Sequence, residues 1–290
     1  MITSAANKGI KNVMLLLSKA KERRKQKAFV AEGIKMFLEA PVSRISQVYI
    51  SEQLAEELEA EASFAVKPAA SREKAAVSSK KETAVLGDKL AFLKRSGQSV
   101  VEIVKADIFN KMCDTKTPQG ILCVVSMPEY DLDGMLEADD GLYLILEDIQ
   151  DPGNLGTMIR TGEGAGLAGV IMSSHTVDIF NPKTIRATMG SIYRVPFIYV
   201  DDLAEAMEAV KAAGIRTYAA HLDGENVYDK ENYCKAAAFL IGNEGNGLSR
   251  ETADLADQYV RIPMLGKVES LNAAIAAALL MYEAARQRRK

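Results

Sequence analysis

Residues 262–274 have the sequence Ile-Pro-Met-Leu-Gly-Lys-Val-Glu-Ser-Leu-Asn-Ala-Ala. An extended Ile-Pro-Met segment is followed by a Ser-Leu-Asn step, which opens a long helix rich in Ala and Leu. Ser and Asn are preferred N-caps of helices. A loop that leads into a helix N-terminus also presents free backbone N–H groups to a ligand. Taken alone, this stretch predicts a well-capped C-terminal helix.

Chain length and composition limit the class of protein. A chain of 290 residues, of which 48% are hydrophobic, is long enough for one or two domains with cores of their own. The longest apolar runs, 142–146 and 273–281, are too short to span a bilayer, and the N-terminus has no apolar signal core. We therefore expect a cytoplasmic protein without membrane segments.

Cysteine and histidine are scarce. Cys113, Cys123 and Cys234 have no metal-binding spacing, and only His175 and His221 could add imidazole ligands. Buried free thiols in a reducing compartment are the expected state of the cysteines. No metal site is predicted.

Charge is unevenly spread along the chain. Residues 1–130 hold 21 Lys and Arg against 15 Asp and Glu, whereas residues 131–290 hold 15 against 24. A basic half suggests a polyanionic partner. The predicted helix at 7–26 ends in a basic cluster, which is either a solvated helix end or a phosphate-contacting patch. The candidates for RNA contact in this cluster are Arg23, Arg24, Lys25 and Lys27.

The first half of the chain contains scattered strand-like segments at 28–33, 48–51, 100–104 and 120–125. Leu54 and Leu58 suggest a short helix between the second and third of them. Residues 67–84 are mostly small and charged, and are expected to form a loop or insertion. Residues 127–140 carry Pro, Gly and acidic residues. We therefore predict an N-terminal domain at 1–128, a linker at 129–140 and a C-terminal domain at 141–290.

The second half has a regular alternation of strand-like and helical segments. Apolar β-type runs occur at 142–146, 169–172, 196–200, 215–219, 237–241 and 259–262, with helical patterns at 155–166, 182–190, 202–213 and 248–256. Such alternation predicts an α/β fold with a parallel sheet covered by helices on both faces. Ligands bind outside the carboxyl ends of the strands in such folds. The residues that follow each strand are therefore the place to look for chemistry.

Polar, glycine-rich segments follow three of these strands. The first, 147–166, contains an Asp-Pro-Gly-Asn turn in which Asn154 can cap the next helix, and Arg160 lies within that helix. The second, 242–249, has the sequence Gly-Asn-Glu-Gly-Asn-Gly-Leu-Ser, and its glycines allow backbone to approach a flat ligand. The third is 262–272. An ordinary salt bridge, turn or helix cap could explain each segment alone, but their joint occurrence indicates a site.

The three segments resemble motifs 1, 2 and 3 of the SpoU/TrmH family of RNA 2′-O-ribose methyltransferases, in the SPOUT class. Asn154 with Arg160 is similar to the first motif, 243–245 to the second, and 262–264 with 270–272 to the third. This resemblance covers about residues 142–290. In the N-terminal half, the segments 29–33 and 117–121 are similar to the ribosomal-protein-L30e-like substrate-binding domain that is often attached to these enzymes.

The resemblance implies a fold, a cofactor and an assembly. The fold would be α/β, with a smaller N-terminal α/β L30e-like domain and a C-terminal SPOUT domain whose parallel sheet contains a deep trefoil knot, a rare exception to the rule against knots. S-adenosylmethionine would be the cofactor. Members are typically homodimers with the active site at the subunit interface, where the helix from Leu271 would pack. The implied cofactor-binding residues are Gly242, Asn243, Gly245, Ile262, Met264 and Leu271.

The implied reaction is the in-line transfer of a methyl group to a ribose 2′-hydroxyl, which only RNA possesses. The implied catalytic residues are Asn154, Arg160, Glu244, Ser270 and Asn272. The family assigns proton removal to the residue matching Arg160. Because arginine stays protonated, stabilisation of the developing alkoxide is the other possible role. Ribosomal RNA is the favoured substrate, with transfer RNA as the alternative.

Three other functions are compatible with parts of the sequence. A SPOUT enzyme that methylates a base nitrogen is disfavoured by Arg160 and by the Ser-Leu-Asn step. A non-catalytic RNA-binding or ribosome-assembly protein is disfavoured by the intact motifs. A nucleotide-dependent oxidoreductase lacks the glycine fingerprint after its first strand.

Overall fold

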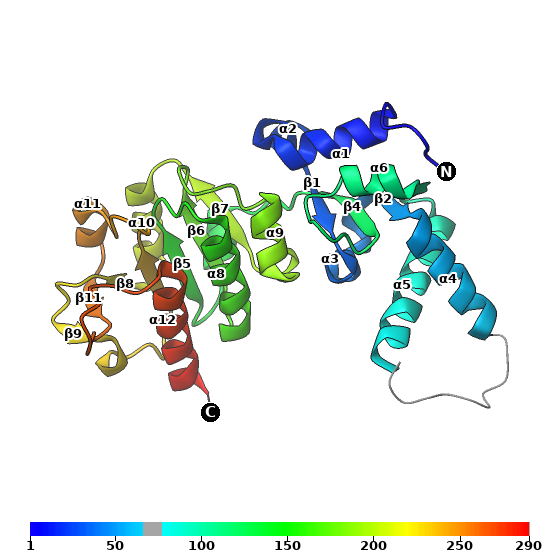
Figure 1. Ribbon diagram of the computed structural model, residues 1–290. Coiled ribbons are helices and arrows are strands. Elements are labelled where there is room, and N and C mark those ends of the chain that lie inside the picture. Colours follow the sequence, from blue (N-terminus) through cyan, green and yellow to red (C-terminus); the bar gives the residue numbers. More distant parts are fainter. Residues whose placement is uncertain (66–76, 290) are drawn as a thin grey trace. The chain divides into compact units, whose positions relative to one another are not determined.

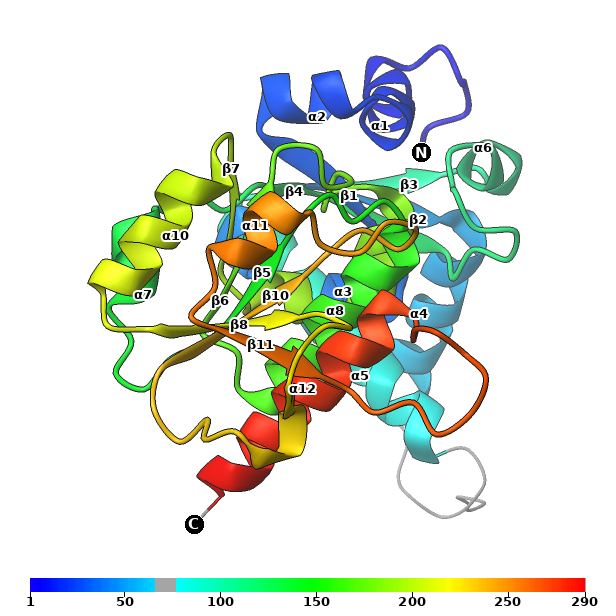
Figure 2. The same cartoon turned by 90° about the vertical axis from the view of Figure 1, so that its left-hand side faces the viewer.

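The computed structural model describes residues 1–65 and 77–289, which form two compact units, Met1–Pro128 and Glu129–Lys290 (Figures 1 and 2). The predicted linker at 129–140 is wrong, because this segment belongs to the second unit. It contains helix α7 (Leu132–Leu136), which the Asp131 side chain caps at the N-terminus. Met135 and Leu136 are buried in the core of that unit, and this burial holds the segment in place.

The first unit is built on a four-stranded mixed sheet. Its strands are β1 (Ala28–Glu32), β2 (Ile45–Ser51), β3 (Val100–Val104) and β4 (Ile121–Ser126), in the order β1-β4-β2-β3. Strand β4 runs antiparallel to β1 and β2, whereas β2 and β3 are parallel. The four strands predicted from the sequence are confirmed. Five of the six residues of β4 are buried, as expected for a central strand.

Helices surround this sheet. They are α1 (Lys8–Ser18), α2 (Ala20–Gln26), α3 (Ile34–Glu39), α4 (Glu52–Ala65), α5 (Val77–Ser96) and α6 (Ala106–Lys111), with the 3-10 turn η1 (Val42–Arg44). The predicted loop at 67–84 is wrong for its last part, since residues 77–84 are helical. Residues 67–76 of that prediction lie outside the described residues.

The single helix predicted at 7–26 is two helices. The chain is extended at Lys19, where the backbone has φ −127° and ψ 109°. Arg23 explains the break, because its Nη1 donates to the carbonyl oxygens of Leu16 (2.7 Å) and Leu17 (3.1 Å) at the end of α1. The side chain thus satisfies carbonyls that the end of a helix leaves without partners.

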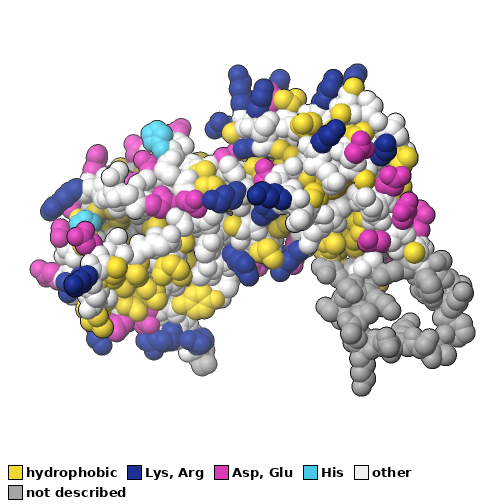
Figure 3. Space-filling model, viewed as in Figure 1, with side chains coloured by type: hydrophobic (Ala, Val, Ile, Leu, Met, Phe, Trp, Pro, Cys, Tyr) yellow, Lys and Arg dark blue, Asp and Glu magenta, His cyan; other side chains and the backbone are white. Residues whose placement is uncertain are grey.

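Arg23 is therefore a correction to the predicted RNA-binding cluster. The residue is only 4% exposed and its guanidinium is bonded to the chain's own carbonyls, so it is not available to a phosphate. Arg24, Lys25 and Lys27 are exposed. Figure 3 shows dark blue side chains standing over α1 and α2. The basic character of this surface agrees with the sequence, but one of its four predicted members is structural.

Arg23→Ala should lower the free energy of unfolding by about 1–3 kcal/mol, because it leaves buried carbonyls unsatisfied. Arg24→Ala, next to it but exposed, should change the same quantity by less than about 0.5 kcal/mol. Urea titration of both variants checks this expectation. Equal effects of the two substitutions would contradict the structural role of Arg23.

The second unit is built on a seven-stranded sheet in which every strand pair is parallel. The order is β7-β6-β5-β10-β8-β11-β9. All six predicted strands are confirmed, and the two-residue β9 was not predicted. The strands are β5 (Leu142–Leu146), β6 (Gly169–Ser173), β7 (Phe197–Val200), β8 (Arg216–Ala220), β9 (Asn226–Val227), β10 (Ala237–Ile241) and β11 (Gln258–Arg261).

The helices of this unit are α8 (Pro152–Ala165), α9 (Pro182–Thr188), α10 (Leu203–Ala212), α11 (Arg250–Asp254) and α12 (Ala273–Arg288), with the 3-10 turns η3 (Ser191–Tyr193) and η4 (Tyr228–Lys230). Asn272 caps α12, as its sequence predicts, by accepting from the backbone N–H groups of Ala274 and Ile275. The cap of α8 is Asp151 and not the predicted Asn154. Pro152 then occupies the first helical position, which needs no N–H donor.

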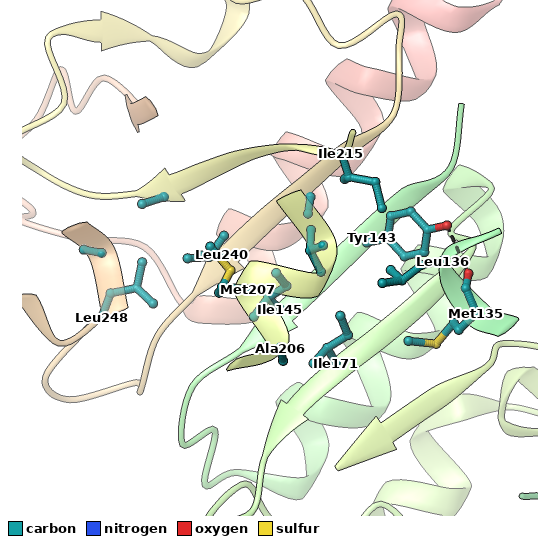
Figure 4. Close-up of a cluster of buried hydrophobic side chains, with 14 residues drawn as sticks. Met135, Leu136, Tyr143, Ile145, Ile171, Ala206, Met207, Ile215, Leu240 and Leu248 are labelled. Carbon is teal, nitrogen blue, oxygen red and sulfur yellow. Dashed lines mark hydrogen bonds between the residues drawn. The ribbon is translucent and has the colours of Figure 1, made fainter. Parts of the chain in front are cut away.

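One hydrophobic cluster joins α7 and α10 to one face of the parallel sheet (Figure 4). Ile145, Ile171 and Leu240 come from three adjacent strands, and Met207 covers them from α10. The hydroxyl of buried Tyr143 donates to the carbonyl oxygen of Met135 (3.0 Å), so its polar atom is satisfied inside the core. This packing fixes the strands whose carboxyl ends carry the polar segments.

No helix among the described residues is long and apolar enough to cross a membrane. All three cysteines are free; Cys123 is buried and Cys113 partly buried, but Cys234 is exposed, so the prediction of a buried thiol is wrong for Cys234.

Candidate active site

The order of the strands brings distant polar segments together. From β5 the sheet extends in one direction through β6 to β7. The later strands lie on the other side of β5, in the order β10, β8 and β11. A crevice forms at such a reversal, outside the carboxyl ends of the strands. The segments that follow β5, β10 and β11 meet there, with the loop that follows β8.

Glu244 is the centre of the hydrogen bonds at this edge. Its carboxylate accepts from the backbone N–H groups of Gln150 and Asp151, each at 3.0 Å, and from Nδ2 of Asn154, also at 3.0 Å. Asn154 Oδ1 in turn accepts from Nδ2 of Asn272 at 3.0 Å. One carboxylate thus ties the loop after β10 to the start of α8 and, through Asn154, to the cap of α12.

These bonds keep Glu244 ionised. Burial by itself would raise the pKa of Glu244, but the hydrogen bonds from Asn154 and from the backbone of Gln150 and Asp151 outweigh it, so the pKa is lowered. Such bonds favour the charged form of a carboxyl group. Glu244 is therefore an acceptor that orients its neighbours, and it is not suited to act as a general acid.

Four of the five predicted catalytic residues gather at one hollow. Asn154, Glu244, Ser270 and Asn272 line it, and we call it the polar hollow. Its remaining lining residues are Gln150, Asp151, Leu271 and Ala273. Glu244, Ser270, Leu271 and Ala273 also line a second space, the cleft described below, so the two spaces adjoin.

Arg160 is the fifth predicted catalytic residue, and it does not line the polar hollow. It lies on α8 six residues after Asn154, which is about 9 Å along the helix axis. The side chain is exposed and makes no hydrogen bond or ion pair with any residue that the structure describes. An unpaired cation on this helix is available to an anionic ligand or to a second protein chain.

The second polar segment is a compact loop held by Asn243. Its Oδ1 accepts from the N–H groups of Gly245 (2.9 Å) and Asn246 (3.2 Å), and its Nδ2 donates to the carbonyl oxygen of Asp148 (2.8 Å). Gly242 lies so close to the backbone of Gly247 that a Cβ atom there would be 2.1 Å from the Gly247 carbonyl carbon. Only glycine can occupy this position.

A cleft of about 420 Å³ opens between this loop and the segment that precedes α12. All six predicted cofactor-binding residues line it: Gly242, Asn243, Gly245, Ile262, Met264 and Leu271. Its volume is within the range of small-molecule sites. Because three of its lining residues are glycines, Gly242, Gly245 and Gly247, a flat, polar ligand can approach the backbone there.

Ala220 at the end of β8 and residues 221–223 of the loop that follows it also line the cleft, and they were missed from the sequence. Among them, His221 packs its ring against Tyr259, with the ring centroids 5.0 Å apart. The rule that ligands lie at the carboxyl ends of strands could have found this loop, because a strand was predicted directly before it. The loop at 221–225 has one glycine, Gly224, and no Asn or Gln side chain such as those in the other three segments.

The described residues contain no group of three or more His, Cys, Asp or Glu that could hold a metal ion. The side chains that line the polar hollow supply amides, a hydroxyl and the carboxylates of Asp151 and Glu244.

Comparisons with known proteins agree with this geometry. The profile of the SpoU rRNA Methylase family matches residues 141–282, and that of an MRM3-like substrate binding domain matches residues 7–123. The chain is 37% identical over 180 residues to a 23S rRNA (guanosine(2553)-2'-O)-methyltransferase, RlmP, of Bacillus subtilis, which covers 62% of this chain and 70% of that protein. It is also 37% identical over 179 residues to a 23S rRNA (uridine(2479)-2'-O)-methyltransferase of Streptomyces viridochromogenes, covering 60% of this chain and 62% of that one.

Solved structures are similar over nearly the whole chain. The AdoMet-bound rRNA methyltransferase of Sinorhizobium meliloti has a TM-score of 0.78 and 28% identity, and the match covers 100% of this chain and 98% of that one. The SpoU methyltransferase AviRb of Streptomyces viridochromogenes has a TM-score of 0.77 and 25% identity, covering 97% and 98%.

The parallel sheet and its glycine-lined cleft, joined to a polar hollow, are those of a methyltransferase of the SpoU type. The chain belongs to the SpoU rRNA methylase family.

The pH dependence of stability tests the Glu244 bonds. A carboxyl with a lowered pKa in the folded protein stabilises it above the ordinary value of 4.5, and this contribution is lost as the pH falls through the folded-state pKa. The side chain of the Glu244→Gln variant cannot titrate. Its amide N–H2 group would face the N–H donors of Gln150, Asp151 or Asn154 and could not accept a hydrogen bond from them. The variant should be less stable at neutral pH, and should lose less stability than wild type between about pH 6 and about pH 3.

The measurement is a urea titration across this pH range, with Glu208→Gln on the exposed face of α10 as the control. The Glu208 variant should follow the wild-type profile. A Glu244→Gln profile that also follows the wild type would show that the bonds to Gln150, Asp151 and Asn154 do not stabilise the fold.

Proposed function

We propose that this protein is an enzyme that transfers a methyl group from S-adenosylmethionine to a ribose 2′-hydroxyl of ribosomal RNA. The observation that carries this proposal is the continuous set of hydrogen bonds from Asn272 through Asn154 to Glu244, at the junction of the polar hollow and the glycine-lined cleft. The rRNA 2'-O-methyltransferases among its relatives, and the AdoMet-bound structure that it resembles, support the same substrate and cofactor.

The cleft suits this cofactor. The close approach of Gly242 to Gly247 leaves backbone surface where a side chain would otherwise stand, and Ile262, Met264 and Leu271 supply apolar contacts for an adenine ring. S-adenosylmethionine supplies an electrophilic methyl group on a positively charged sulfur. Asn243 accepts hydrogen bonds from the backbone of the loop after β10, so its role is to fix the conformation of the loop that lines the cleft.

The polar hollow suits a ribose. Glu244 uses its carboxylate to fix Asn154, and Asn154 fixes Asn272, so the amide groups cannot rotate freely. Ser270, which borders both spaces, has a hydroxyl that can donate to or accept from a sugar hydroxyl. Fixed polar groups of this kind orient a substrate at little entropic cost during the reaction.

Arg160 would stabilise the oxygen nucleophile. As the 2′-oxygen forms its bond to the methyl carbon, the methyl–sulfur bond of S-adenosylmethionine would break, S-adenosylhomocysteine would leave and the hydroxyl proton would pass to water. A fixed cation would lower the energy of the negative charge that develops on the oxygen as its proton leaves. Arginine stays protonated in proteins, so electrostatic stabilisation is the role its chemistry favours over that of a base. Its exposure on α8 leaves the guanidinium free to meet the RNA or a site completed by another subunit.

We infer a homodimer from an exposed apolar stripe on α12. Ile275, Leu279 and Tyr282 recur at helical spacing and are 50%, 36% and 50% exposed. Figure 3 shows hydrophobic side chains at the surface over this helix. Helix α12 packs against α8, and a Cβ on Gly164 would lie 2.9 Å from the Tyr282 hydroxyl, so the stripe lies on the same side as the exposed face of α8. A second copy on this stripe would come close to Arg160.

A trefoil knot in the second unit is part of the proposal. Strand β11 lies towards one edge of the sheet, but α12, which follows it, packs against β10 and β5 near the middle. Five residues of the connection line the same cleft as the loops after β8 and β10, namely Ile262, Met264, Glu269, Ser270 and Leu271. A chain end that returns past two earlier loops in this way is compatible with a threaded path.

The first unit would bind the RNA. An L30e-like domain is supported by the match of residues 7–123 to an MRM3-like substrate binding domain. Arg24, Lys25 and Lys27 remain candidates for phosphate contacts, since all three are exposed. Ribosomal RNA is favoured over transfer RNA by the names of the relatives, and the expected cytoplasmic location suits such a substrate.

Arg160→Ala should lower methyl transfer to ribosomal RNA by at least about 100-fold, the effect of removing one group that stabilises an oxyanion. Its affinity for S-adenosylmethionine, measured by calorimetry, should stay close to that of wild type, because Arg160 does not line the cleft. Thr157→Ala, one turn earlier and also exposed, is the control and should retain activity. Parallel loss of turnover and cofactor binding would assign Arg160 a structural role instead.

The double variant Leu279→Glu with Tyr282→Glu should convert a dimer into a monomer, because burying charged side chains in an apolar interface has a large desolvation free energy. Light scattering after size-exclusion chromatography measures the mass. Arg286→Ala, on the same helix and in an ion pair with Glu283 of that helix, should remain dimeric. A wild-type protein that is monomeric at micromolar concentration would overturn the dimer.

A further inference from the structure

The polar hollow lacks a cation, although its proposed substrate is an anion. Two of its lining residues, Asp151 and Glu244, are acidic, and none of those described is Lys or Arg. In RNA each ribose carries a phosphate on the carbon next to the one that bears the 2′-hydroxyl. A strand whose ribose enters the hollow must therefore bring a phosphate close to two carboxylates, and nearby positive charge is needed to offset their repulsion.

Lys183 places a positive charge at the rim of this hollow. Its Nζ lies 3.1 Å from Oδ2 of Asp151, and the two side chains are 58% and 46% exposed. The other oxygen of Asp151 accepts from the backbone N–H of Asn154 at 2.9 Å. Lys183 is thus bonded to Asp151, and Asp151 is bonded to Asn154, whose side-chain amide is proposed to orient the ribose.

Packing between α8 and α9 determines where this lysine lies. A Cβ on Gly156 would lie 2.5 Å from the Cβ of Ala187 and 2.7 Å from the carbonyl oxygen of Thr184, so the two helices are in close contact. Lys183 is in the first turn of α9, where Asn181 accepts from its backbone N–H. Its side chain passes Gly153, where a Cβ would be 3.5 Å from the lysine Cε.

The carboxylate of Asp151 fixes the position of the Lys183 ammonium before any ligand binds. The hydrogen bonds from the Asn154 backbone and from Lys183 lower the pKa of Asp151, so the carboxylate stays charged and holds the ammonium in place. An exposed ion pair contributes little to folding stability. The fold alone therefore gives little reason for a lysine at this position, whereas an anionic substrate does.

We propose that Lys183 is a substrate-positioning residue that binds the RNA backbone phosphate next to the ribose held in the polar hollow. This inference rests on the proposed function, because it takes RNA as the ligand. Asp151 lines the polar hollow but not the cofactor cleft, so Lys183 acts on the RNA side of the reaction and not on S-adenosylmethionine. The ammonium exchanges part of its contact with Asp151 for the phosphate oxygens when the strand enters.

The test compares Lys183→Ala and Lys183→Arg with Lys211→Ala. Lys211 is a matched control, because it is also an exposed lysine of the second unit in an ion pair with an aspartate, Asp257, at 3.5 Å. Methyl transfer is measured against the concentration of ribosomal RNA at several salt concentrations. Calorimetry with S-adenosylmethionine and thermal unfolding are measured on the same samples.

Lys183→Ala should raise the KM for RNA by about three- to tenfold. It should also reduce the slope of log KM against log salt concentration by roughly the amount expected for the loss of one phosphate contact. Lys183→Arg should recover most of the loss, since a cation is restored. Cofactor affinity and thermal unfolding of both should match those of Lys211→Ala.

Two outcomes overturn the inference while leaving the proposed function intact. One is a Lys183→Ala enzyme whose KM and salt dependence equal those of Lys211→Ala. The other is a loss of cofactor affinity in proportion to the loss of turnover, which would place Lys183 on the cofactor side. A wild-type protein that binds RNA but transfers no methyl group to it would instead overturn the proposed function itself.

Discussion

The carboxylate of Glu244 is the interaction on which the site depends. It receives two backbone N–H groups from the loop after β5 and one amide from α8, and so joins segments that lie 90 residues or more apart in the chain. A charged acceptor with several donors is among the stronger hydrogen-bonding arrangements in proteins. Without it, the start of α8 and the loop after β10 would have no direct side-chain connection at the point where the ribose is proposed to bind.

The parallel sheet makes this interaction possible. Its strands all end at one edge, and their order reverses beside β5, so loops that are distant in sequence face one another. Packing then sets the distances. Gly242 lets the loop after β10 fold back on itself, and Gly156 lets α9 approach α8 closely enough for Lys183 to reach Asp151.

Several residues of the site serve the fold and the proposed chemistry together. Asn272 caps α12 with its Oδ1 and holds Asn154 with its Nδ2. Asp151 caps α8 with one oxygen, binds Lys183 with the other and lends its backbone N–H to Glu244. Because the same side chains end helices and orient neighbours, the geometry of the site is coupled to the stability of the second unit. The exposed α12 stripe and Arg160 are different, since neither has a partner within the described chain that explains its chemistry.

Resemblance to the motifs of a known family, and not local features, identified four residues of the hollow and six of the cleft from the sequence. The sequence by itself determined the alternation of strands and helices, the parallel sheet and the polar segments after three strands. These depend on local features, namely apolar periodicity, glycine and helix caps, which a short stretch of chain reveals. Only the tertiary structure decided contacts between distant residues. It turned Arg23 inwards onto the end of α1, made Asp151 and not Asn154 the cap of α8, and drew residues 129–140 into the second unit. It also added the loop after β8 to the cleft and brought Lys183 to Asp151. Each of these outcomes follows from the path of the chain through the sheet, because burial and hydrogen bonding between segments far apart in sequence depend on how the whole unit packs.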